Sequence, residues 1–400
     1  MRTDGKGART LEVLRAFLKM GITAFGGPIA HLGYFRDEFV VRRRWLDEHA
    51  YADLVSLCQF LPGPASSQVG FSLGLLRAGW SGALAAWVGF TLPSALLLVL
   101  FATVAPQFAG PTGVAMLHGL QLAAVAIVAQ AVWSMARTLC PDWPRAAIAL
   151  GAMAVMLMAN SPLAQVIVIL AGGALGVVVR RWAVVVAPVG HLPSLVTRRT
   201  GLTTLGLFII LLAGLPLLRV LQPQGPLALL DAFYRSGALV FGGGHVVLPL
   251  LNDAVVEPGW VSNDTFLAGY GATQAVPGPL FTFAAYLGAV ATPAPSPAVG
   301  AIIGLLAIFL PGLLVLTGVL PFWQSLRSGR GARGVMAGVN AAVVGLLAAA
   351  LWTPVWTSAV RSVSDGAIAA GGFLLLALSR APPLFVVALV VVSAWIADKF

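Results

Sequence analysis

The chain has 400 residues, of which 59% are hydrophobic and only 10% are charged, with 24 Lys and Arg against 14 Asp and Glu. A soluble domain carries about a quarter charged residues, so the composition excludes an ordinary soluble enzyme or binding module. The two cysteines, Cys58 and Cys140, lie in or beside apolar segments and indicate neither a disulfide framework nor a metal site. The basic excess lies in short loops between apolar runs, which is typical of cytoplasmic loops and not of a nucleic-acid surface.

Apolar runs recur from one end of the chain to the other. About 20 apolar residues span a bilayer, and only helices or closed barrels satisfy their backbone there. The runs do not alternate as barrel strands would, so the sequence predicts an all-α polytopic membrane protein. The first 20 residues show no pattern of a removable signal. The runs are 81–104, 114–136, 163–187, 202–221, 335–353 and 384–397, with a shorter one at 366–379.

The chain repeats its own motifs. A shift of 216 residues superposes one FGG triplet on another, and a shift of 215 superposes one PGP triplet on another. Repeated motifs in the same order indicate two homologous halves. We predict halves at 10–187 and 228–397, joined at 188–227 by a basic loop and a linker transmembrane helix. The superposed residues are Phe25-Gly26-Gly27 on Phe241-Gly242-Gly243, Asp37 on Asp253, Gln59 on Gln274, and Pro62-Gly63-Pro64 on Pro277-Gly278-Pro279.

Loop charges predict how the halves are oriented. Bases crowd Arg36–Arg44 and Arg180–Arg199, which places these loops and the N-terminus in the cytoplasm. Segments 10–42 and 47–77 must then enter and leave on one side, as re-entrant pairs of half-helices. The second-half loop 252–264 holds three acids and no base, which indicates the opposite face. We therefore predict inverted-topology halves, each with two re-entrant hairpins and four spans.

Four backbone breaks interrupt these hairpins, at 26–28, 62–64, 242–244 and 277–279. A break at membrane depth survives only where it is buried in protein or faces an aqueous cavity. After each tip a half-helix begins inside the membrane, with orphan N–H groups and about half a positive charge. We expect the four tips to converge and to form an anion site from backbone groups.

Side chains near the breaks can add hydrogen-bond donors. Ser66 and Thr282 could instead be plain helix caps, and either histidine could be a packed residue with no ligand. Gln59 and Gln274 are stronger candidates because the repeat retains both. The predicted substrate-binding residues are Gly26, Gly27, Pro28, His31, Gln59, Pro62, Gly63, Pro64, Ser66, Ser67, Gln68, Gly242, Gly243, Gly244, His245, Gln274, Pro277, Gly278, Pro279 and Thr282.

Fixed charges are scarce, so their positions are candidates for function. Lys19 aligns with Arg235, and these cations could neutralise a dianion. Asp37 aligns with Asp253, and these carboxylates could carry a coupling proton, whereas Glu38 has no counterpart. The alternative interpretation places these groups at the membrane surface, with the cations snorkelling.

The motifs FGGPIAHLGYFRDEF at 25–39 and QFLPGPASSQ at 59–68 resemble the N-terminal half of chromate ion transporters. FGGGHVVLPLL at 241–251 and TQAVPGPLFTFAAYLG at 273–288 resemble their C-terminal half. The resemblance covers most of the chain and matches the long, two-domain form of the family. It implies proton-motive export of chromate across the bacterial inner membrane, with chromate resistance as the outcome and sulfate as the isosteric competitor. The expected partners are these anions, the lipid bilayer and a second copy of the chain, with no cofactor and no nucleic acid.

Other functions stay open from sequence alone. An anion channel would use the same broken helices but would conduct without saturation. A transporter of sulfate or of another anion would use the same donors. An enzyme is disfavoured, because the chain has no GxGxxG on a strand–helix unit and no CxxC, and neither histidine has a nucleophile in register.

Overall fold

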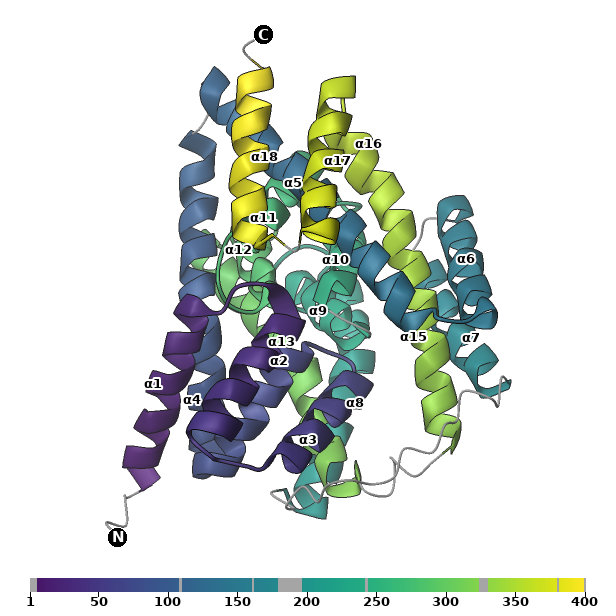
Figure 1. The fold of residues 1–400 in the computed structure, drawn as a ribbon. Coiled ribbons are helices and arrows are strands. Elements are labelled where there is room, and N and C mark those ends of the chain that lie inside the picture. The colour runs from purple at the N-terminus through teal and green to yellow at the C-terminus, as the bar shows by residue number, and fades with distance from the viewer. Residues whose placement is uncertain are drawn as a thin grey trace.

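The computed structural model describes residues 6–107, 110–159, 162–178, 196–241, 244–323, 330–379 and 381–398. Within these ranges every regular element is a helix, and the two ends of the chain lie at opposite ends of the molecule (Figure 1). Five of the described helical segments are long and apolar enough to cross a membrane, as the composition predicts. They are Ala65–Gln107, Thr112–Leu139, Arg198–Leu221, Pro297–Phe322 and Gly334–Ala359.

The first hairpin turns at the first glycine break. α1 (Lys6–Thr23) ends just before it, and α2 (Gly27–Phe35) begins within it and continues as the π-helix η1 (Arg36–Arg42). Gly26 and Gly27 have φ values of 99° and 76°, which L-residues with a side chain rarely adopt. The backbone therefore reverses here, and α1 and α2 lie side by side (Figure 1).

The second hairpin turns at the first PGP. α3 (Glu48–Phe60) leads into it, and α4 (Ala65–Val104) leaves from it. α4 itself breaks at Ala78 and Gly79, where the backbone is not helical. Its two parts then pack closely, since a Cβ on Gly74 would lie 2.3 Å from the carbonyl oxygen of Gly82. The predicted re-entrant segment at 47–77 thus corresponds to α3 and the first part of α4.

The second half repeats this order after the linker helix α8 (Arg198–Leu221), which contains the predicted linker run. Its hairpin elements are α9 (Pro226–Ala238), η4 (Gly244–Val246), α10 (Val247–Val255), α11 (Asn263–Gln274), η5 (Leu280–Thr282) and α12 (Phe283–Val290). The remaining helices are η2 (Ala105–Gln107), α5 (Pro111–Leu139), α6 (Trp143–Met158), α7 (Pro162–Val178), α13 (Pro297–Val319), η6 (Leu320–Phe322), α15 (Arg330–Ala350), η7 (Leu351–Trp356), α16 (Thr357–Ala359), α17 (Val363–Leu378) and α18 (Pro383–Ala397).

The number of spans per half stays a prediction, and the helices that follow the hairpins differ in length. α6, α7, α17 and α18 have 15 to 17 described residues, fewer than the roughly 20 that cross a bilayer. Each half therefore contributes two long helices and two short ones, although the predicted run at 163–187 continues outside the described residues. The segments of α6 and α13 are absent from the predicted apolar runs, and α13 lies in the most apolar of the five long segments.

The two halves exchange their short helices. α6 and α7 pack on α15 of the second half, and α17 and α18 pack on α5 of the first half. α7 and α15 cross where Gly172 and Gly176 meet Gly334 and Gly338. Small residues four apart on both helices allow this close backbone approach, which is a common way for membrane helices to associate. The predicted domain boundaries stay predictions, because each half completes the packing of the other.

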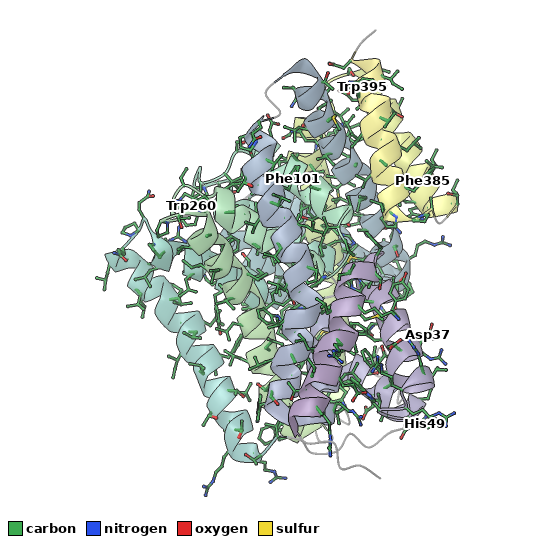
Figure 2. All side chains as sticks on the ribbon, turned by 90° about the vertical axis from the view of Figure 1, so that its left-hand side faces the viewer. Asp37, His49, Phe101, Trp260, Phe385 and Trp395 are labelled. Atoms are coloured by element: carbon green, nitrogen blue, oxygen red, sulfur yellow. The ribbon has the colours of Figure 1, made fainter. Side chains whose placement is uncertain are left out.

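Equivalent parts of the halves lie far apart along the long direction of the molecule. Figure 2 shows His49 near the lower end and Trp260 toward the upper end. His49 lies in the first turn of α3, just after the loop between the hairpins of the first half, and Trp260 lies in the corresponding loop of the second half. The placement is what an inverted repeat would produce, and the inverted topology stays a prediction.

Candidate anion site at the helix breaks

The breaks of one half bond to those of the other. The N–H of Gly63, in the first PGP, donates to the carbonyl of Val240 at 2.8 Å. The N–H of Gly278, in the second PGP, donates to the carbonyl of Ala24 at 2.9 Å. Ala24 and Val240 are equivalent under the 216-residue shift, so the two bonds are related by the repeat. The expected convergence of the tips is present in the structure.

Close packing accompanies these bonds. Gly63 has φ 111°, and a Cβ added there would lie 2.8 Å from the Cα of Gly312 in α13. Gly244, the described residue of the second glycine break, lies against Pro28 of the first, with 3.2 Å from a built Cβ to the proline Cγ. Gly242 and Gly243, also predicted as site residues, lie outside the described residues. The tips at 26–28, 62–64 and 277–279 and Gly244 are therefore packed backbone to backbone, and we call this meeting point of the four breaks the crossing.

The crossing changes which amides an anion can use. The N–H groups of Gly63 and Gly278 are occupied by the carbonyls of the opposite half, and the prolines on either side have none. In α4 the first intrahelical bond runs from the N–H of Gln68 to the carbonyl of Pro64, so the amides of Ala65, Ser66 and Ser67 precede it. These first-turn amides, not the PGP glycines, are the orphan donors.

The half-helices that begin at the crossing have no side-chain caps. α2 begins after Gly26, α4 after Pro64 and η5 after Pro279, each without a capping hydrogen bond. Many helices that begin elsewhere do carry one. The capping residues there are Asp47, Asp142, Thr197, Ser262, Ser296 and Ser362. The inner helix ends thus leave their first-turn N–H groups without a side-chain cap.

Polar side chains enrich the first-half tip. Ser66, Ser67 and Gln68 are at most 3% exposed. The Nε2 of Gln68 donates to the carbonyls of Pro62 at 2.9 Å and Gly312 at 2.8 Å, which fixes the tip to α13. The hydroxyls of Ser67 and Ser72 are buried without a partner among the described residues. Ser72 was not predicted, although it lies one turn after Gln68 on the same helix face.

The cap interpretation of Ser66 and Thr282 does not match the structure. Pro64, not Ser66, occupies the N-cap of α4. The hydroxyl of Thr282 donates to the carbonyl of Pro279 at 2.8 Å, so it satisfies a carbonyl and caps no amide. Both residues are buried, and neither hydroxyl makes a capping hydrogen bond, although Thr282 occupies the N-cap position of α12.

The histidines have different surroundings. His31 is fully buried, with Nε2 3.2 Å from the carbonyl oxygen of Ala24 and its ring edge-on to Phe90. Its Nδ1 has no partner among the described residues. In His245, Nδ1 lies 2.7 Å from the hydroxyl of Tyr270. His31 therefore shares the Ala24 carbonyl with the second-half tip, whereas His245 is held in an aromatic cluster.

The two repeated glutamines are not equivalent in their surroundings. Gln59 is exposed at the end of α3. Gln274 is half-buried at the end of α11, and its Nε2 is buried without a partner in the described structure. Retention by the repeat thus does not give the pair one shared role.

The first-half charges lie in a surface network. Lys19 is half-exposed, with its Nζ 4.0 Å from an oxygen of the buried Glu38, which also accepts from Arg42 at 3.0 Å and Arg43 at 2.7 Å. Asp37 is 74% exposed and lies 3.7 Å from Arg36. Lys19 and Asp37 thus lie on the surface of the protein, Glu38 is buried among cations, and the roles of all three stay predictions.

The second-half charges are arranged differently. Arg235 donates to both carboxylate oxygens of the buried Asp231, at 2.8 and 2.7 Å. Asp253 accepts a hydrogen bond from Gln165 of α7. Lys19 and Arg235 therefore align in sequence without sharing an environment, and so do Asp37 and Asp253.

Comparison with known proteins identifies the family. The chromate transporter family profile matches residues 11–177 and 227–395. The chain belongs to the chromate transporter family. Among its relatives, a probable chromate transport protein of Synechococcus elongatus is 28% identical over 347 residues, covering 85% of this chain and 83% of the relative. A chromate transport protein of Pseudomonas aeruginosa is 27% identical over 360 residues, covering 84% and 79%.

An uncharacterized transporter of Methanocaldococcus jannaschii is 26% identical over 343 residues, covering 85% of this chain and 83% of the relative. No solved structure matches the chain. The two matched stretches correspond to two homologous parts of one membrane protein. Family membership and the apolar helices identify the chain as a multi-pass membrane transporter of this family.

Proposed function

We propose that this transporter exports chromate from the cytoplasm across the bacterial inner membrane and thereby gives chromate resistance, with sulfate as a competitor. The observation that carries the proposal is the crossing of the breaks, where half-helices begin without side-chain caps. The names of the relatives support chromate as the transported anion. Basic residues in the loops beside α1 and α3 favour a cytoplasmic N-terminus.

The crossing supplies donors that suit a tetrahedral dianion. Chromate has four oxygens, each of which accepts hydrogen bonds. The first-turn amides of α4 and the hydroxyls of Ser67 and Ser72 can donate to them from one side. The uncapped starts of α2 and η5 contribute from neighbouring elements. Such donors are fixed in place before the anion arrives, so binding requires little reorganisation.

The membrane potential can drive this export. Moving one charge through 100 mV changes its free energy by about 2.3 kcal/mol, so an outward-moving dianion gains about 4.6 kcal/mol when the inside is negative. Proton exchange can add to this drive. We expect the halves to rock about the crossing, which would open the site to each side in turn.

The test is flux in proteoliposomes at a set potential. Chromate uptake should follow the potential, saturate with concentration and fall when sulfate is added. A double Ser67→Ala and Ser72→Ala variant should raise the KM for chromate several-fold, because two donors are lost. Ser56→Ala is the matched control, since the Ser56 hydroxyl is exposed and bonds within α3. Flux that never saturates would identify a channel, and absent chromate flux would refute the proposal.

A further inference from the structure

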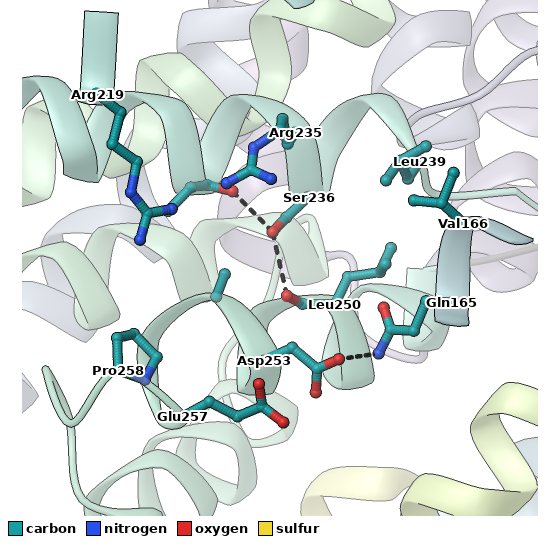
Figure 3. Close-up of a pocket in the computed structure, with 12 residues that line it drawn as sticks. Gln165, Val166, Arg219, Arg235, Ser236, Leu239, Leu250, Asp253, Glu257 and Pro258 are labelled. Carbon is teal, nitrogen blue, oxygen red and sulfur yellow. Dashed lines mark hydrogen bonds between the residues drawn. The ribbon is translucent and has the colours of Figure 1, made fainter. Parts of the chain in front are cut away.

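A cavity of about 390 Å³ opens between α7, α8, α9 and the end of α10 (Figure 3). Its polar lining consists of Gln165, Arg219, Arg235, Ser236, Asp253 and Glu257. A water molecule occupies about 30 Å³ in the liquid, so the space can hold a small oxyanion with part of its hydration shell.

Two arginines form one wall of the cavity. Arg235 is held bidentately by Asp231, and Arg219 reaches the same carboxylate at 3.4 Å. Asp231 is fully buried, whereas the side chains of Arg219 and Arg235 are 33% and 36% exposed. One carboxylate cannot satisfy the ten N–H donors of two guanidinium groups. The wall therefore presents excess positive charge and free donors, the groups that bind planar or tetrahedral oxyanions.

Two carboxylates form the opposite wall. Asp253 accepts from Gln165, and Glu257 lies about one turn further along the chain, beside it in Figure 3. Burial raises the pKa of the Glu257 carboxyl, which is in the loop after α10, above its usual range. Two nearby carboxylates disfavour each other's ionisation, so one of them readily accepts a proton.

The charge count decides what the cavity can hold. With all groups ionised, the arginines supply two positive charges and Asp231, Asp253 and Glu257 supply three negative ones. An oxyanion would then enter a site of net charge −1. One proton on Asp253 or Glu257 makes the net charge of the site zero, and a proton on each makes it +1.

Among the described residues that line this cavity and its neighbour, no further charged group adds to this count. Asp253 also faces a smaller space toward α6, α15 and η7, where the described lining includes Asn252, Leu346 and Thr353 and no further titratable group. The first half does not repeat these charges, because Arg15 stands at the position equivalent to Asp231 and Val41 at the position equivalent to Glu257. The arrangement thus belongs to the second half.

We infer that this cavity is a second oxyanion site, in which the arginines bind the anion once Asp253 or Glu257 is protonated. The inference rests on the proposed function for its choice of anion, and it adds a place where anion and proton meet. Linkage then requires reciprocity: acid pH strengthens anion binding, and a bound anion favours protonation. A proton and an oxyanion would occupy the cavity together.

The test is equilibrium binding of radiolabelled sulfate, which stays a dianion between pH 5.5 and pH 8, and of radiolabelled chromate to the full-length chain in lipid nanodiscs. Wild-type sulfate binding should strengthen about tenfold or more on acidification, since one like charge is removed beside a dianion. Asp253→Asn should bind at pH 8 about as the wild type binds at pH 5.5. The matched control is Asp37→Asn. Asp37 aligns with Asp253 in the repeat, but its carboxylate is 74% exposed, so this variant should keep the wild-type pH profile.

A second variant tests the arginine wall. Arg219→Gln should weaken the acid-dependent binding at every pH, while Arg235 continues to neutralise Asp231 and preserves the fold. An unchanged pH profile in Asp253→Asn, or unchanged affinity in Arg219→Gln, would overturn the inference. If the wild type shows no saturable chromate binding or flux at any pH, the proposed function fails instead. The two failures are therefore distinguishable.

Discussion

Replacing Gly63 by alanine tests whether the helix breaks are as tightly joined as the structure shows. The added Cβ would lie 2.8 Å from the Cα of Gly312, whereas ordinary contacts begin near 3.4 Å. The facing atom is backbone, so the two chains must separate by about 0.6 Å. Gly63 also has φ 111°, a conformation that alanine rarely adopts.

The two effects add to a measurable loss. Left-handed backbone costs an L-residue about 1–2 kcal/mol. Overpacking by one methyl group in a well-packed region costs about 1–3 kcal/mol. We expect Gly63→Ala to lower the free energy of unfolding by about 2–5 kcal/mol, which should appear as a fall of several degrees in the melting temperature.

Two other glycines separate strain from steric overlap. Gly27 has φ 76° but nothing within 4 Å of a built Cβ, so Gly27→Ala should show the strain alone. Gly33 lies inside α2 with open space around it, so Gly33→Ala should be neutral or stabilising by up to about 1 kcal/mol. Thermal unfolding of the purified chain in detergent, followed by tryptophan fluorescence, gives the order directly. If Gly63→Ala melts with the wild type, or no lower than Gly27→Ala, the tips are not in contact as described.

Three further predictions concern other parts of the molecule. In a cysteine-free background, His49→Cys and Pro258→Cys should react with an impermeant thiol reagent from opposite sides of the membrane, and labelling from one side would contradict the inverted repeat. Asp231→Asn should lower the unfolding free energy by about 1.5–3 kcal/mol in a melting experiment, because a buried carboxylate loses its charged hydrogen bonds to arginine. Gln68→Glu should destabilise the chain far more than Gln59→Glu, since Gln68 donates to two buried carbonyls and Gln59 is exposed; equal melting temperatures would refute this.

The positions of the breaks could be predicted because glycine and proline act locally. The chain turns at 26–28 and 62–64 because these residues adopt or enforce non-helical backbone, whatever surrounds them. Convergence of the tips could also be predicted, because each re-entrant chain must place its turn inside the membrane, where the turns of the two halves can meet. The class of protein could be predicted from composition, because long apolar runs must be placed in a membrane whatever their neighbours are.

Pairing between distant segments could not be predicted in this way. The bond from Gly63 to Val240 depends on the three-dimensional register of two halves, which no local pattern specifies. Likewise Asp37 and Asp253 align in sequence, yet only Asp253 meets a helix from the other half, through Gln165. A repeat predicts equivalent positions, but the surroundings of each position depend on neighbours that the repeat does not share.

The exchange of short helices between the halves has a consequence for synthesis. α6 and α7 emerge from the ribosome well before α15, on which they pack. At about 5–20 residues per second, the delay is on the order of ten seconds. During that time the glycines of α7 lack the α15 glycines against which they pack in the finished chain. Assembly of this transporter must therefore hold an unfinished helical hairpin in the membrane until its partner helix is translated.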